Sequence, residues 1–140
     1  MDRDGFARDA WGTEGNRIRY AVHGDSIAGV DRALTRSNGL QLAGLAALAA
    51  APHYLYVCAT AGGAGCGAAA NQLTRRAAFV LLSTGANGAL APAPGSDEAR
   101  NLDADNSFVA REPGPDFDDV LHWGAIHALV NRMVVAGRLP

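Results

Sequence analysis

The sequence predicts a single α+β domain over residues 1–140, with a small, largely antiparallel sheet and a short C-terminal helix. Short apolar runs bounded by Gly, Pro, Asn and Asp recur along the chain, whereas helical spacing of apolar residues is confined to two brief stretches. The chain has 140 residues, of which 49% are hydrophobic, so it is long enough to enclose one hydrophobic core. No internal repeat divides it.

The first half of the chain predicts a strand, a helix and a second strand. Residues 17–22 alternate apolar and polar side chains, which is the pattern of a half-buried strand. Residues 40–51 place leucines among alanines and stop before Pro52, because proline cannot continue a helix. Residues 54–59 are rich in aromatic and β-branched side chains, which favour a strand.

The second half predicts three further strands and the last helix. The strands are expected at residues 77–83, 107–111 and 120–123. Residues 85–105 have the Gly, Pro, Asn and Asp content of a loop. Residues 125–136 carry an apolar stripe at helical spacing, and Gly137 is the expected stop signal.

The two cysteines, Cys58 and Cys66, enclose a short loop of Ala, Thr and Gly. They are either two inert thiols or a disulfide, and a metal site would need further ligands close by. A disulfide is the simpler interpretation, because it closes a flexible loop and would stabilise the fold by roughly 2–3 kcal/mol. It would also place the protein in an oxidising compartment.

Neither a nucleic-acid surface nor a membrane-spanning helix is expected within these 140 residues. The net charge is -2 and the twelve basic residues are all arginines scattered along the chain, so no nucleic-acid surface is expected. No apolar run reaches the roughly 18–20 residues of a membrane-spanning helix. His23, His53 and His127 stand at no metal-ligand spacing to carboxylates or cysteines, so no histidine site is predicted.

Three segments, in this order, resemble the periplasmic domains of type IV pilins and type II secretion pseudopilins. Residues 9–20 are similar to the Asp-Pro-Trp-Gly stretch of pseudopilins, although Ala10 replaces the proline and residues 13–15 widen the turn. Residues 78–88 resemble the apolar strand that ends in Ser-x-Gly-x-Asn-Gly. Residues 97–133 look like the acidic loop, final strand and tail of a pilin-like subgroup.

This resemblance implies a structural subunit rather than an enzyme. The chain would be the head domain of a minor pilin or pseudopilin in a type IV pilus or type II secretion-like filament. Its native form would carry a leader peptide and a hydrophobic N-terminal helix of about 25 residues, truncated here, which anchors the protein in the inner membrane. The implied partners are other pilin or pseudopilin subunits, and the implied location is the periplasm or the cell surface.

The acidic stretch of residues 97–119 raises the question of bound calcium. Calcium takes six to eight hard oxygen ligands, and some major pseudopilins carry it in the equivalent loop. Asp97, Asp103 and Asp105 are the ligands expected on that resemblance. The alternative is a solvated loop whose carboxylates cap turns and pair with Arg100 or Arg111.

A second resemblance concerns the SGNH family of esterases and lipases. Gly24-Asp25-Ser26, Gly85-Ala86-Asn87 and the spacing of Asp119 and His122 are similar to its motifs. They imply a small secreted esterase with nucleophile Ser26, base His122, orienting Asp119 and oxyanion donor Asn87. That family needs a parallel sheet with crossover helices, whereas only one helix is expected between the strands here. The alternative is that Gly24-Asp25-Ser26 forms a turn and that His122 is a partly buried structural residue.

Overall fold

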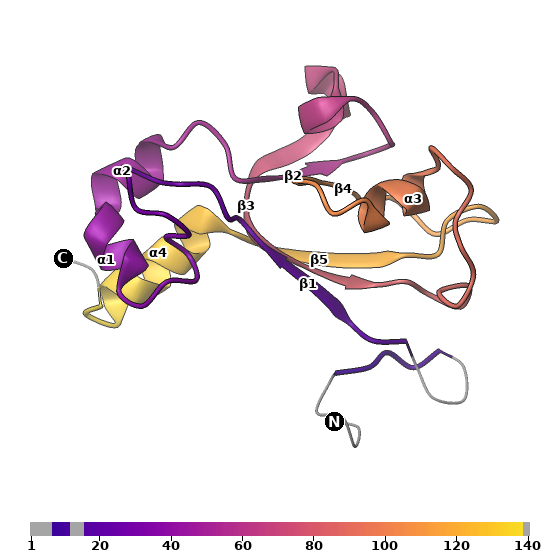
Figure 1. The fold of residues 1–140 in the computed structure, drawn as a ribbon, viewed down its shortest axis with the longest axis horizontal. Helices are drawn as coiled ribbons and strands as arrows, with labels where there is room; N and C mark the ends of the chain where they lie inside the picture. Colours follow the sequence, from indigo (N-terminus) through magenta and orange to yellow (C-terminus); the bar gives the residue numbers. More distant parts are fainter. Residues whose placement is uncertain (1–6, 12–15, 139–140) are drawn as a thin grey trace.

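The computed structural model of the chain describes residues 7–11 and 16–138. Figure 1 shows one curled sheet with helices α1, α2 and α4 gathered at one end and α3 at the other. The elements, in chain order, are β1 (Arg19–Val22), α1 (Gly39–Ala43), α2 (Leu45–Ala50), β2 (Leu55–Cys58), two short 3-10 turns (Ala64–Cys66 and Ala69–Asn71), β3 (Gln72–Ser83), α3 (Asp97–Leu102), β4 (Ser107–Val109), β5 (Val120–Ala125) and α4 (Ile126–Val135).

The predicted α+β class and the short C-terminal helix are confirmed, while the antiparallel sheet is only partly right. Strand β3 is antiparallel to β1, β2 and β5, but β4 joins the sheet parallel to β2. Ala77 pairs with Leu55 of β2 and with Ala125 of β5, so these two strands flank β3 on opposite sides. The strand predicted over residues 107–111 is present as β4, but a hydrophobic pattern gives the faces of a strand and not its direction, so its parallel pairing could not be predicted.

Several predicted boundaries need correction. Strand β3 begins at Gln72, five residues before the predicted start, because its polar first half pairs with β2. The predicted helix over residues 40–51 is interrupted at Gly44, whose φ of 76° ends α1 and starts α2. The predicted turn at Trp11 and Gly12 lies partly outside the described residues.

The loop predicted over residues 85–105 contains helix α3. Ser96 begins this helix as its N-cap, since its side chain accepts a hydrogen bond from the Ala99 N–H at 3.1 Å. Asp97 and Glu98 lie in the first turn, where the helix dipole favours acidic residues. At six residues, α3 is too short for an apolar stripe to reveal it in the sequence.

The core lies in three adjoining clusters. The first fills the space between the helices and one end of the sheet, and includes Leu48, Tyr54 and Ile126. The second lies over the middle of the sheet around Val57 and Val80. The third packs Val109 and Phe117 around the two cysteines. No helix within the described ranges is long and apolar enough to span a membrane.

Candidate functional site

The three segments that resemble pilins converge on the turn that follows β3. Asp9 begins the contact: its Oδ1 accepts hydrogen bonds from the N–H groups of Trp11 (3.1 Å) and Asn16 (2.7 Å). Its Oδ2 accepts one from the Ser83 hydroxyl at 2.6 Å, at the end of β3. Burial acts to raise the pKa of the Asp9 carboxyl, but these hydrogen bonds favour the charged form and lower the pKa overall.

The turn itself is held from two sides. The Asn16 side chain donates to the carbonyl of Gly85 at 2.6 Å, which fixes the turn to the N-terminal segment. On the other side, Asp118 Oδ2 accepts from the N–H groups of Ala86 (2.8 Å) and Asn87 (3.1 Å). Gly85 has a φ of 61° and lies against Asp118, so a side chain here would be strained and would collide with Asp118.

Helix α3 completes the arrangement through Glu98. The Asn87 side chain donates to both Glu98 carboxylate oxygens, at 3.0 and 3.1 Å, and the Asp118 N–H donates to Oε1 at 3.1 Å. We call this set of seven residues the convergent network; it comprises Asp9, Asn16, Ser83, Gly85, Asn87, Glu98 and Asp118. It joins the N-terminal segment, the end of β3, helix α3 and the approach to β5.

Asn101, also on α3, holds the edge of β4. Its Oδ1 accepts from the Val109 N–H at 2.6 Å, and its Nδ2 donates to the Val109 carbonyl at 3.1 Å. The same Nδ2 donates to Asp119 Oδ2 at 2.7 Å. Asn101 is buried, so all of these bonds are protected from water.

Two carboxylates of this network, Glu98 and Asp118, meet a third, that of Asp119. Oxygen atoms of Glu98, Asp118 and Asp119 lie within 4.8 Å of one another, and Glu98 and Asp119 are buried. Burial raises the pKa of Asp119 to about 6; the charges of Glu98 and Asp118 act in the same direction, while the Asn101 hydrogen bond and Arg19 oppose it. Within the described residues, this trio is the only group of three or more His, Cys, Asp or Glu side chains close enough together to share a metal ion.

The predicted calcium ligands are not brought together. Asp97 accepts from Arg111 Nε at 2.7 Å at the start of α3. Asp103 and Asp105 both pair with Arg100, at 3.1 and 2.9 Å, at the other end of the helix. The three aspartates therefore form two arginine-centred groups, as the solvated-loop interpretation expected.

Sequence reasoning missed Glu98, Asn101 and Asp118 as a cluster. The acidic stretch contains both acids, but only helix α3 turns Glu98 and Asn101 toward the adjacent pair Asp118 and Asp119. Because that helix was not predicted, no periodicity could assign its buried face. Calcium binding itself stays a prediction.

The predicted disulfide is confirmed. Cys58, the last residue of β2, is bonded to Cys66 with an S–S distance of 2.01 Å and a Cα–Cα distance of 5.4 Å. Both cysteines are 1% exposed and pack against Val109 and Phe117. The bond ties the glycine-rich loop to the third core cluster.

The predicted esterase residues lie apart. Ser26 is exposed in the loop that follows β1, and Asp119 is buried with its carboxylate bonded to Asn101. His122 is exposed on β5; because side chains alternate along extended chain, it lies on the opposite face of the sheet from Asp119. Asn87 directs its amide at Glu98. No hydrogen bond in the described part of the chain links Ser26, Asp119 and His122.

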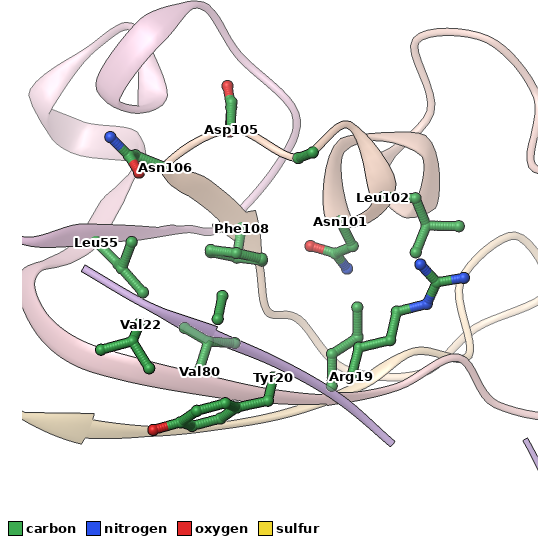
Figure 2. A pocket seen from close by; sticks show the side chains of 13 residues that line it. Arg19, Tyr20, Val22, Leu55, Val80, Asn101, Leu102, Asp105, Asn106 and Phe108 are labelled. Atoms are coloured by element: carbon green, nitrogen blue, oxygen red, sulfur yellow. The ribbon is translucent and has the colours of Figure 1, made fainter. Parts of the chain in front are cut away.

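An open groove of about 640 Å³ runs between β1 and the β4–α3 side of the molecule (Figure 2). Leu55, Val80 and Phe108 point into it and give it an apolar floor. Arg19 and Asn101 stand at one end. The groove exists because β1 and β2 pair with successive halves of β3 and diverge from each other.

The opposite face of the sheet also exposes large apolar side chains. Tyr20 on β1 is 65% exposed and Val120 on β5 is 53% exposed. The Tyr20 ring lies 6.3 Å from that of Phe79, which packs over Gly124 on the neighbouring strand. This surface, made of Tyr20, Phe79 and Val120, is called the exposed sheet face below.

A scan against protein-family models, a search of curated proteins and a search of solved structures each found no match.

Proposed function

We propose that this chain is the head domain of a pilin-like structural subunit, a minor pilin or pseudopilin of a type IV pilus or type II secretion-like filament. The observation that carries the proposal is the convergent network. Residues 9–20, 78–88 and 97–133 resemble pilins separately in the sequence, and their polar residues bond directly to one another.

The network also gives the motifs a physical role. Asp9 and Asn16 fix the chain entering β1 to the turn after β3, and Asp118 fixes the same turn to β5. A head domain that transmits contacts along a filament needs its N-terminal entry joined rigidly to its sheet. Charge-assisted hydrogen bonds to Asp9, Asp118 and Glu98, most of them partly buried, contribute to that rigidity.

Two further features support a structural role outside the cytoplasm. The disulfide between Cys58 and Cys66 is of the kind that persists in oxidising compartments. The exposed sheet face presents apolar side chains to solvent, and exposed apolar patches commonly mark protein contacts. The resemblance assigns such contacts to neighbouring subunits.

The direct test is the location of the protein in its native host. An antibody raised against this domain is used to probe inner membranes, sheared surface filaments and culture medium. We expect the domain in the membrane and filament fractions, and its loss from filaments when the peptidase that cleaves pilin leaders is deleted. A protein that stays freely soluble in both strains would overturn the proposal, as would acyl-probe labelling of Ser26.

A surface variant makes the test sharper. Tyr20→Glu places a charge on the exposed sheet face without disturbing the core, because Tyr20 is largely exposed. Leu90→Glu is the matched control, since Leu90 is 73% exposed in a loop outside the sheet. We expect Tyr20→Glu to reduce incorporation into filaments and Leu90→Glu to leave it unchanged, with equal amounts of both variants in the membrane.

A further inference from the structure

His23 is buried at the junction between the sheet and the helices. It follows β1 directly and is 2% exposed, and its backbone N–H donates to the Ala78 carbonyl at 3.1 Å. Its ring atom Nδ1 is buried with no hydrogen-bond partner among the described residues. A protonated imidazole carries a proton on both ring nitrogens, so the charged form of His23 would bury an unpaired donor.

The ring of His23 faces a second histidine and a tyrosine. The His53 ring lies 6.2 Å away and nearly perpendicular, at 87°. The Tyr54 ring is 4.9 Å from His23, and its hydroxyl donates to the Leu48 carbonyl on α2 at 2.6 Å. The contact at His23 is therefore connected to helix α2 through one side chain.

Arg76 strengthens the same junction from β3. Its guanidinium lies 5.1 Å from the centre of the Tyr54 ring, and its Nη2 donates to the Ala49 carbonyl at 2.9 Å. A second bond from Nη1 reaches the carbonyl of Ala51, just after α2. Helix α2 is thus held to the sheet by Tyr54 and Arg76, with His23 and His53 packed beneath them.

We propose that His23 and His53 form an acid-sensitive joint, which releases helix α2 from the sheet when His23 takes up a proton. This goes beyond the proposed role in assembly and does not depend on it. Protonation of His23 would bury a charged ring whose Nδ1 has no hydrogen-bond partner, at a site faced by the rings of His53 and Tyr54. Asp25, which is exposed, is the acidic group that opposes this effect.

The direction of the pH dependence follows from His23. Burial lowers the pKa of His23 below its ordinary value of 6.5; Asp25 acts to raise it, and the nearby His53 acts to lower it. The open state therefore binds the proton more tightly than the closed state. The closed state, in which α2 is held to the sheet, has its full stability above pH 6.5. It loses this stability as the pH falls through the pKa of His23 in the folded chain.

Hydrogen exchange on the intact chain tests this inference. The amides of Leu48 and Ala51 bond within the turns of α2 and report the opening of this helix. The amides of β3 report whether the sheet stays intact. After correction for intrinsic exchange, we expect the opening constant of α2 to rise by up to about tenfold per pH unit below pH 6.5. The β3 amides should keep their protection over the same range.

Two variants test whether His23 carries the pH dependence. His23→Phe keeps a ring in the site and removes the titration, so the pH dependence of opening at α2 should disappear. His122→Gln is the matched control, because His122 is exposed on β5, and it should behave as the unmodified chain. An unchanged pH slope in His23→Phe would overturn the proposal, as would a slope lost in His122→Gln.

A titration of the unmodified protein covers the case in which His23→Phe does not fold. The ring resonances of His23, followed by NMR, should titrate below pH 6.5, over the same pH range in which α2 opens. A His23 ring that titrates at or above pH 6.5 while α2 stays protected would overturn the joint without any variant.

Discussion

Asp9 and Ser83 lie 74 positions apart in the chain and are joined by a hydrogen bond of 2.6 Å between the Ser83 hydroxyl and Asp9 Oδ2. The same carboxylate accepts hydrogen bonds from the backbone N–H groups of Trp11 and Asn16. One aspartate therefore closes its own turn and attaches that turn to the end of the central strand. Its contribution to stability should exceed that of an ordinary surface carboxylate.

Replacing Asp9 tests this role. Asp9→Ala removes a carboxylate that accepts hydrogen bonds from four donors, two of the backbone and two of side chains. We expect the free energy of unfolding to fall by about 1–3 kcal/mol. Urea unfolding followed by tryptophan fluorescence measures the change. Asp31→Ala is the control, because Asp31 is exposed in the loop before α1. Equal losses in the two variants would show that the Asp9 bonds contribute nothing specific.

Asp119 should make the protein less stable as the pH rises. The pKa of its carboxyl is about 6 in the folded chain and 3.8 in the reference state, so the folded chain binds the proton more tightly. The stabilising effect of that proton is complete below pH 3.8 and is lost as the pH rises through 6. We expect Asp119→Asn, which can still accept from Asn101, to be more stable than the unmodified chain at pH 8.

The measurement is the free energy of unfolding of both proteins between pH 5 and pH 8. Asp119 contributes a decline in stability as the pH rises through 6, on which the opposite effect of His23 is superimposed equally in every variant, and Asp119→Asn should remove this decline. Glu112→Gln removes an exposed carboxylate from the same stretch and should leave the decline intact. A decline of the same steepness in Asp119→Asn would assign the pH dependence to another group.

The disulfide should contribute a stability that reduction removes. Closing a loop of this length restricts the unfolded chain, and the loss expected for Cys58→Ala with Cys66→Ala is about 2–3 kcal/mol. Thermal unfolding with and without a reductant measures the effect. The double variant should no longer respond to the reductant, and a response that persists would place the redox effect elsewhere.

Gly124 should resist substitution because of Phe79. A Cβ on Gly124 would collide with the Phe79 ring, so Gly124→Ala should cost about 1–3 kcal/mol of stability through overpacking. A double-mutant cycle with Phe79→Leu measures the coupling, since a smaller side chain leaves room for the methyl group. Additive losses in the double variant would exclude this contact as the cause.

What could be predicted from the sequence depended on local contacts. Residues 17–22 alternate clearly, and the disulfide joins cysteines only eight positions apart, so both were predicted. Helix α3 and the parallel pairing of β4 were not, because six residues are too few for a periodicity and a pattern carries no direction. The contact of Glu98 with Asp118 spans twenty positions, and only the fold brings these residues together.

The side chain of Asn101 has a consequence for how molecules of this protein meet. Its amide offers Val109 one acceptor and one donor, as the main chain of an adjoining strand would, and Asp105 covers the neighbouring Ser107 N–H at 2.6 Å. The outer margin of β4 is thereby blocked against the edge-to-edge pairing that leads to amyloid-like stacking. An Asn101→Leu protein would leave that margin unmasked, and at high concentration it would tend to self-associate through strand addition.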